Sequence, residues 1–355
     1  MNDKNLVNKT KNRIIALDYL RGFFILVIIV DHLWRWPNIF QYVSGRGELW
    51  TSAAEGFVII SGLLVGYIRG YKDRSKPLLE VTKKLVKRGI ILYIWMIITT
   101  LTLVSISWLL TFKGNIAYIP IPTNDWKGLI TSVLSFDYVH TLTHFLYLYA
   151  IFLFISPLVI WLFRQRLAWI VAVASGFLWW IGLVQDIEWM QWQVLFFIPA
   201  IAGFYLEALL TWYRQLGSTT KRIIRLSSIG LTLSTAIISA AIILPTEPAT
   251  FKNILFSRDP LTLARIAISF VWFVGLISLF QYILPFLERY FSWLLRVLGQ
   301  NSLTAYIVHI VPLMICQFFL VEVDNFWINS LLALACILVT WSILKIPHIN
   351  KFIPR

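Results

Sequence analysis

Apolar segments about 20 residues long recur along almost the whole chain, and this pattern limits the possible folds more than any other feature. Segments of this length suit α-helices that cross the hydrocarbon core of a membrane, which is about 30 Å thick. Apolar residues make up 59% of the 355 residues and charged residues only 14%, a balance that excludes a water-soluble globular protein. We therefore predict an all-α, polytopic integral membrane protein.

The pattern predicts ten transmembrane helices in a single domain that covers residues 1–355. They are expected at 14–34, 52–71, 89–111, 142–163, 167–184, 191–212, 226–244, 263–285, 302–321 and 326–345. A basic segment, 1–13, precedes the first helix, and a tail, 346–355, follows the last. A cleaved signal peptide is disfavoured, because the first apolar segment contains Asp18 and Arg21 and no small-residue cleavage site ends it.

Lysine and arginine are distributed unevenly between the two sides that these helices define. If the N-terminus is cytoplasmic, the inner segments hold 23 of the 31 basic residues, the outer loops hold six and the spans hold two. This asymmetry agrees with the positive-inside rule and predicts that both termini are cytoplasmic. The net charge of +14 is thus explained by topology, and we predict no nucleic-acid partner, because the basic residues lie in short loops.

The first predicted helix carries ionisable residues along one face. An α-helix turns about 100° per residue, so Arg21 and His32 are separated by whole turns to within about 20°. They point the same way, roughly 16 Å apart along the helix. Asp18 lies within about 40° of their line, whereas Asp31 lies about 100° away from it. Ionisable groups at such depth normally face a bundle interior or a wet cavity, so we interpret this face as functional.

Four of the five histidines fall at the outer level of the predicted bundle, and only His348 lies in the tail. Glu55 begins the second helix at the same level as His32. A carboxylate beside His32 would fix its tautomer and stabilise its protonated form, so we predict His32 as a general base and Glu55 as its orienting group. His144 and His309 are candidates for the acceptor side of the site. The fourth outer histidine, His140, is interpreted as a solvated loop residue.

The basic residues on the inner side have two interpretations. The segment 69–88 holds eight of them, including the cluster KKLVKR at 83–88. Topology and attraction to anionic headgroups explain such a loop, and a docking patch for a phosphorylated donor is the alternative. Asp18 and Arg21 can pair as i,i+3 neighbours, and Arg265 has no obvious partner in its helix. Five residues are therefore assigned to donor binding or to structural pairing: Asp18, Arg21, Lys84, Lys87 and Arg265.

Five segments, together with the spacing in the first helix, resemble known membrane enzymes. Arg21, ten intervening residues and His32 are similar to the signature of the membrane acyltransferase type 3 superfamily. LDYLRGFFILVIIVDHL and SAAEGFVIISGLLVGY resemble the first two spans of the OpgC family of glucan succinyltransferases within it. FLYLYAIFLFISPLVIWL, WQVLFFIPAIAGFYL and LGQNSLTAYIVH resemble the fourth, sixth and ninth spans of that family. The similar segments are spread along nearly the whole chain.

This resemblance implies a ten-helix enzyme that transfers an acyl group from cytoplasmic acyl-CoA to a hydroxyl of an extracytoplasmic acceptor. In type 3 enzymes the histidine of the first span is catalytic, which points to His32, and the arginine matches Arg21. The chain departs from the family pattern in two places. The loop motif of two arginines three apart is present only as Lys84 and Lys87, and His144 stands where an OpgC-type aspartate is expected. These departures bear on donor binding and on the choice of acyl group and acceptor.

We therefore predict an acyl-CoA-dependent membrane O-acyltransferase of the EC 2.3.1 type. The acyl group is expected to be one such as succinyl or acetyl, and the acceptor a glycan or a similar hydroxyl compound. Acyl-CoA is a co-substrate, no bound cofactor or metal is predicted, and membrane lipids of a bacterial plasma membrane are the remaining partners. The alternative is a proton-coupled transporter, in which the Asp, Arg and His residues within the membrane form a relay.

Overall fold

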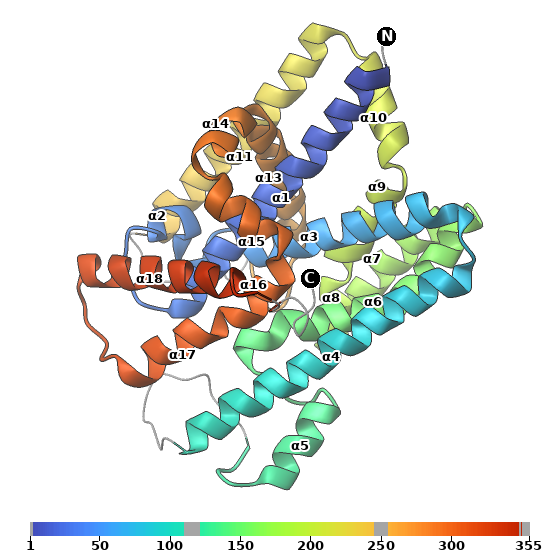
Figure 1. Cartoon of the computed structure of the whole chain (residues 1–355). Helices are drawn as coiled ribbons and strands as arrows, with labels where there is room; N and C mark the ends of the chain where they lie inside the picture. The colour runs from blue at the N-terminus through green and yellow to red at the C-terminus, as the bar shows by residue number, and fades with distance from the viewer. Residues whose placement is uncertain (1–2, 110–120, 245–254, 348, 350–355) are drawn as a thin grey trace.

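The computed structural model of the chain is a bundle of helices (Figure 1). It describes residues 3–109, 121–244, 255–347 and 349, and it contains no strand among them. Within these described residues, eight helices are long and apolar enough to cross a membrane, and a ninth crossing is added if the pair bent by 62° around Tyr205 counts as one span, against the ten that were predicted. The helix at Asp3–Leu33, with its charged residues, is not among the eight. The prediction of an all-α polytopic membrane protein is confirmed. The end of the third predicted span, 110–111, and most of the predicted tail, 346–355, lie outside the described residues.

Each of the ten predicted spans has a helical counterpart in the structure. The N-terminal half forms α1 (Asp3–Leu33), α2 (Gln41–Ser44), α3 (Ala53–Val65), α4 (Leu78–Leu109), α5 (Trp126–Leu134) and α6 (His144–Arg164). The C-terminal half forms α7 (Ala168–Gln185), α8 (Glu188–Trp192), α9 (Val194–Phe204), α10 (Leu206–Gln215), α11 (Ser218–Ile243), α13 (Leu263–Tyr282), α14 (Leu284–Tyr290), α15 (Val297–Gln300), α16 (Ser302–Val308), α17 (Ile310–Phe319) and α18 (Phe326–Leu344). Short 3-10 or π segments join them at η1 (Gly45–Gly47), η2 (Gly66–Tyr71), η3 (Lys72–Ser75), η4 (Thr141–Thr143) and η5 (Ser292–Arg296).

Two basic segments that were predicted to lie outside the spans are helical. α1 begins at Asp3, so the basic N-terminal segment continues without a break into the first span. α4 begins at Leu78, well before its predicted start, so the basic cluster 83–88 lies on a helix and not in a loop. Val81 and Leu85 are buried four residues apart on one face of this extension. Their packing stabilises the helix in a region where charge alone suggested a loop.

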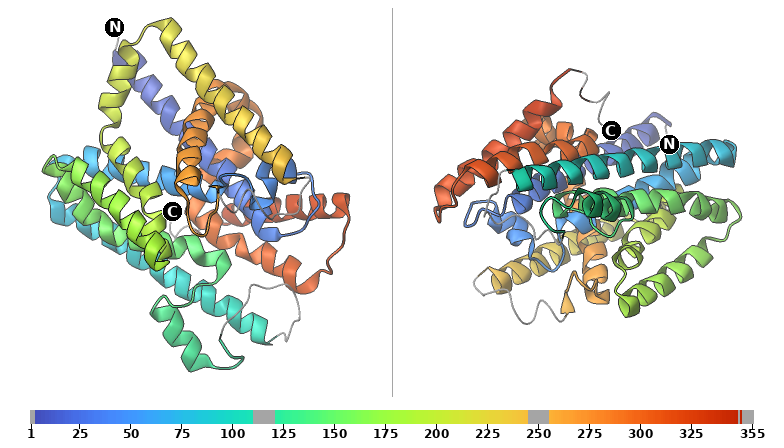
Figure 2. Two further views of the ribbon diagram at one scale, coloured as in Figure 1. Left: turned by 180° about the vertical axis from the view of Figure 1, so that it is seen from behind. Right: turned by 90° about the horizontal axis from the view of Figure 1, so that it is seen from below.

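The C-terminal half of α1 lies inside the bundle, whereas its N-terminal end projects from it (Figures 1 and 2). α1 packs against α15, η5, α3, α13 and α18, while α4 packs along α6, α3 along α9, and α11 along α13 at the edge of the molecule. Tyr19, Leu20, Ile29 and Val30 of α1 are completely buried. This central position brings the ionisable face of α1 against protein and keeps it away from lipid.

Two glycines allow the inner half of α1 to approach α15 and the segment before it. A Cβ atom added to Gly22 would lie 1.9 Å from the carbonyl oxygen of Leu295. One added to Gly299 would lie 1.7 Å from the carbonyl oxygen of Asp18. Backbone contact this close is possible only for glycine, and small residues serve the same purpose between helices in membranes. The contact fixes the part of α1 that carries Arg21.

The orientation of the bundle stays a prediction that cysteine labelling can test. With the N-terminus in the cytoplasm, a cysteine at Ser75, between α3 and α4, is expected to react with an impermeant thiol reagent only from the cytoplasmic side. A cysteine at Thr123, ahead of α5, should react only from the outside. The native Cys316 and Cys336 are buried, and alanine replaces both in the test protein to keep the background low. Labelling of both positions from one side would overturn the orientation.

Candidate functional site

Two cavities lie at different levels of α1, one at each end of its ionisable face. The cavity at the C-terminal end of this face, called the outer cavity after the predicted orientation, has a volume of about 430 Å³ and is lined in part by His32. The inner cavity has a volume of about 130 Å³ and is lined in part by Arg21. Asp18, one turn before Arg21, is attracted by it and interacts with the side chain of Gln300. One face of one helix therefore reaches two separate polar spaces.

The outer cavity is assembled from segments that are distant in the sequence. Its walls come from the end of α1, the segments 34–54, 139–148, 188–192 and 258–259, and Tyr306 of α16. Charged and aromatic side chains line it together, among them Asp31, His32, Trp34, His144, Trp192 and Arg258. Its volume and mixed lining suit a polar organic ligand. No group of three potential metal ligands occurs in the described parts of the chain.

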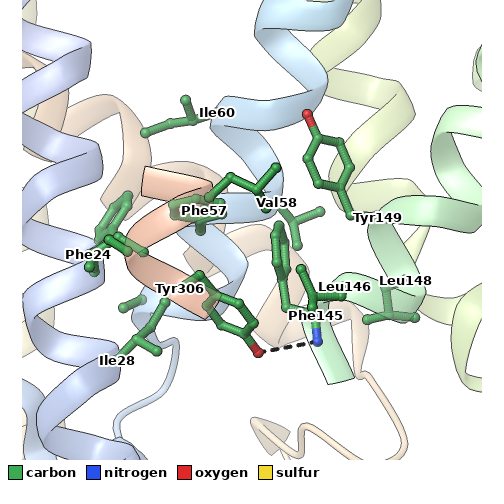
Figure 3. Close-up of a cluster of buried hydrophobic side chains, with 14 of the residues drawn as sticks. Phe24, Ile28, Phe57, Val58, Ile60, Phe145, Leu146, Leu148, Tyr149 and Tyr306 are labelled. Carbon is green, nitrogen blue, oxygen red and sulfur yellow. Dashed lines mark hydrogen bonds between the residues drawn. The ribbon is translucent and has the colours of Figure 1, made fainter. Parts of the chain in front are cut away.

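His32 has a histidine partner at the wall of this cavity. Its Nδ1 atom lies 3.0 Å from Nε2 of His309. His309 is completely buried between α16 and α17, and its own Nδ1 contacts the carbonyl oxygen of Tyr306. The ring of Tyr306 stands edge-on to that of His32, and its hydroxyl accepts a hydrogen bond from the N–H of Phe145 (Figure 3). His32 is thus held between His309 and Tyr306.

Glu55 does not orient His32, so the predicted pairing of these two residues is wrong. One carboxylate oxygen lies 2.6 Å from Nε of Arg265. The other accepts hydrogen bonds from the hydroxyl and, at 2.9 Å, from the N–H of Ser52. Ser52 and Glu55 form a capping box at the start of α3, in which the carboxylate satisfies an otherwise free N–H. The carboxylate is already engaged by the ion pair and the cap.

Arg265 has the partner that its own helix could not supply. Its side chain and that of Glu55 are 1% and 0% exposed, so the pair is completely buried. The guanidinium also donates to the carbonyl oxygens of Leu49 at 3.3 Å and Phe256 at 3.0 Å. These bonds tie the outer end of α13 to the start of α3 and to two connecting segments. The structure therefore favours the structural role among the two predicted for Arg265.

The two histidines before α6 have different environments. His144 lines the outer cavity, and its Nε2 lies 2.7 Å from a carboxylate oxygen of Glu188. His140 is only 3% exposed, and its Nδ1 accepts a hydrogen bond from the N–H of Leu142, so its interpretation as a solvated residue is wrong. Burial lowers the pKa of His140 to about 4, and its imidazole is neutral near pH 7. His144 stays a candidate for the acceptor side, whereas His140 caps a turn.

The outer cavity also contains residues that were not predicted from the sequence. Asp31 points about 100° away from His32 around the axis of α1. It nevertheless lines the same cavity, because the cavity extends around the end of this helix. Tyr306 precedes His309 by one helical turn, a spacing that was available as a signal. Arg258 lies in a connecting segment without a recognisable motif, and the sequence offers no signal for it.

The inner cavity is strongly basic. Four of its lining residues are basic: Arg21, Arg69, Lys84 and Arg88. Lys87, which was predicted together with Lys84, is exposed and is not part of the described lining. Arg88 takes its place one turn after Lys84 on α4. Arg69 and Arg88 belong to the basic segment 69–88 that was considered as a donor docking patch, but they were not singled out, although the i,i+4 spacing of Lys84 and Arg88 was a usable signal.

Some hydrogen-bond donors at the inner cavity are unused. Arg21 donates to the hydroxyl of Ser302, and the guanidinium of Arg88 lies 5.5 Å from the centre of the Tyr149 ring. The Nε atoms of both arginines are buried and have no hydrogen-bond partner in the part of the chain that the structure describes. Buried polar groups normally have partners, and guanidinium groups bind oxyanions with well-defined geometry. The inner cavity therefore suits a phosphate or carboxylate group.

Aromatic rings from α3, α6 and α16 form a buried cluster (Figure 3), and some of them line the two cavities. The guanidinium of Arg21 lies 5.8 Å from the centre of the Phe57 ring, which meets the Phe145 ring edge to face at 4.9 Å. The ring of Phe145 also lies 5.4 Å from that of Tyr149 and 5.3 Å from that of Tyr306. Tyr149 lines the inner cavity, whereas Phe145 and Tyr306 line the outer one. Rings that line one cavity are therefore in direct contact with rings that line the other.

Comparison with known families matches one family model, described as OpgC protein, to residues 13–349. Comparisons with curated proteins and with solved structures find no match. The matched range contains both cavities and every residue that lines them.

Proposed function

The chain belongs to the OpgC family, which suggests a glucan-modifying membrane acyltransferase, and from this premise we propose that it is an acyl-CoA-dependent O-acyltransferase. It takes an acyl group such as succinyl or acetyl from cytoplasmic acyl-CoA and transfers it to a hydroxyl of an extracytoplasmic glycan, in a bacterial plasma membrane. One observation supports this most: α1 holds Arg21 at a basic inner cavity and His32 at a polar outer cavity. A cytoplasmic donor and an outer acceptor need two such sites across a thin barrier.

The inner cavity supports the binding of a phosphorylated donor. Its arginine and lysine side chains match the phosphate groups of acyl-CoA through charge-assisted hydrogen bonds. At about 130 Å³ it is smaller than the roughly 300 Å³ of an ordinary small-molecule site, so it receives only a phosphate-bearing part of the donor. The thioester arm then has to pass the rings of Phe57, Phe145, Tyr149 and Tyr306, which move apart for each transfer.

The outer cavity supports base-assisted attack by a hydroxyl. An alcohol is a weak nucleophile at neutral pH, and a positioned base overcomes this limit. A ring nitrogen of His32 accepts the hydroxyl proton while the hydroxyl oxygen forms a bond to the thioester carbonyl carbon. The carbon–sulfur bond then breaks, and protonated His32 returns the proton to the departing CoA thiolate. The products are an ester on the glycan and free CoA.

Turnover by the purified protein in liposomes tests this function. Succinyl-CoA and acetyl-CoA are supplied on the side of the inner cavity and a glucan oligosaccharide on the other side. Release of free CoA in step with acylated glucan, detected by mass spectrometry, is the expected result. Counterflow of unmodified glucan without CoA release would instead support the alternative of proton-coupled transport.

Charge reversal at the inner cavity is expected to weaken donor binding selectively. Lys84→Glu should raise the KM for acyl-CoA about 3- to 10-fold, because a carboxylate at this position repels the donor phosphates. The shift should shrink at high salt, since Lys84 is exposed and already pairs with Glu80 on α4. Lys87→Glu makes the same charge change on the same helix outside the cavity lining and should leave the KM nearly unchanged. Equal changes in KM for both variants would mean that general surface charge, and not the inner cavity, causes the effect.

A further inference from the structure

His309 is placed so that both of its ring nitrogens have a partner. Nδ1 contacts the carbonyl oxygen of Tyr306, and Nε2 lies 3.0 Å from Nδ1 of His32. The residue lies at the break between α16 and α17. Pro312 follows it and lacks the N–H that would otherwise bond to the carbonyl oxygen of Val308, which explains a break at this point. The His309 ring is thereby fixed between a backbone carbonyl and His32.

The partners of His309 determine where the protons lie. A carbonyl oxygen can only accept a hydrogen bond, so Nδ1 of His309 must carry a proton. In a neutral imidazole the other nitrogen is then an acceptor, and Nε2 of His309 receives the Nδ1–H of His32. His32 is neutral as well, so its Nε2 carries no proton. This nitrogen is the one left for the outer cavity, which His32 lines.

A protonated His309 would reverse this pattern, and its surroundings oppose that state. The ring is completely buried, and a buried cation without a counter-ion costs several kcal/mol. The two rings contact each other, the carbonyl oxygen of Tyr306 and the ring of Tyr306, and none of these partners is an anion. The carboxylates at this level have other partners, because Glu55 is paired with Arg265 and Asp31 interacts with Ser44 and Arg258. Both rings of the pair are therefore neutral before the reaction.

We infer that His309 is a positioning residue, which holds His32 in the tautomer whose unprotonated Nε2 accepts the proton of the acceptor hydroxyl. Once His32 is protonated, its Nδ1–H still points at the lone pair of His309, so the same bond stabilises the charged ring. His309 thus has the role that was predicted for Glu55. The catalytic meaning of this arrangement rests on the proposed acyl transfer, whereas the tautomer itself does not.

Three substitutions at His309 separate positioning from packing. The amide oxygen of His309→Gln can reach the place of Nε2 and still accept from His32, so this variant should keep most of the wild-type kcat. His309→Asn can satisfy only the Tyr306 carbonyl, and His309→Leu can satisfy neither partner. Both should lower kcat about 10- to 100-fold while the KM for acyl-CoA stays nearly unchanged. Equal kcat values for the Gln and Asn variants would overturn the inference.

The tautomer can also be measured without turnover. In protein labelled with ¹⁵N-histidine and reconstituted in lipid, solid-state NMR distinguishes protonated from unprotonated ring nitrogens, and the His32→Ala spectrum identifies the His32 signals. We expect His32 to carry its proton on Nδ1 at neutral pH, and to lose this preference in His309→Asn. A proton on Nε2 of wild-type His32 would overturn the inference. If the protein transferred no acyl group but showed the expected tautomer, the proposed function would fail and the positioning role would stand.

Discussion

Replacing His32 with alanine is expected to lower the rate of acyl transfer by about 100-fold or more, the largest effect on activity that we predict. In the proposed mechanism the imidazole is the base at the wall of the outer cavity, and alanine removes the group that takes the hydroxyl proton. The loss should appear in kcat, because the site proposed for the donor phosphates is the inner cavity, roughly 16 Å away along α1. Steady-state rates of CoA release in liposomes measure the change.

Two controls test whether the loss of turnover is specific to the imidazole of His32. Binding of acyl-CoA to His32→Ala should match the wild type, which shows that insertion and the inner cavity are intact. His144→Ala removes a second imidazole from the same cavity, one whose Nε2 is engaged by Glu188, and should lose less than about 10-fold. Normal turnover by correctly folded His32→Ala would remove the base from the mechanism and leave the ionisable face of α1 with a structural role.

The type of the elements could be predicted because lipid leaves an apolar segment few choices. A backbone that crosses a membrane must satisfy its own hydrogen bonds, so each apolar segment becomes a helix. The ends of the helices are not set by lipid and depend instead on which nearby side chains pack against the protein. Leu78 begins α4 because Val81 and Leu85 are buried, although charged residues surround them. The 62° bend at Tyr205 lies within a segment that was predicted as one span, and apolarity alone does not reveal it.

The site could be predicted where it depends on one helix and not where it depends on contacts between helices. Helical periodicity placed Arg21 and His32 on one face, and each lines a cavity. Their partners are remote, since His309 is 277 residues from His32. Arg265 is 210 residues from Glu55, and no local pattern links them. The capping-box pattern that begins at Ser52 was readable, however, and it indicates a role for Glu55 at the start of α3.

Arg265→Met is expected to destabilise the protein by about 3–5 kcal/mol, the largest effect on stability that we predict. Methionine fills much of the space of the arginine side chain but leaves the buried carboxylate of Glu55 without its counter-ion. The carbonyl oxygens of Leu49 and Phe256 also lose a donor. Thermal unfolding of the purified protein in detergent, followed by intrinsic tryptophan fluorescence, should show a marked fall in Tm. An unchanged Tm would mean that the ion pair contributes little to the fold.

A second substitution separates the charge of this pair from its packing. Glu55→Gln in the Arg265→Met background removes the unpaired charge, and the amide oxygen can still accept from the N–H of Ser52 to cap α3. The double variant should be more stable than Arg265→Met alone, because neutral groups often replace a buried ion pair at little cost. Equal Tm values would show that the volume change, and not the stranded charge, causes the loss.

Because Glu55 is bonded to Arg265 and Ser52 and not to His32, the double variant should also keep most of the wild-type turnover. Loss of turnover in a stable double variant would return Glu55 to the catalytic machinery.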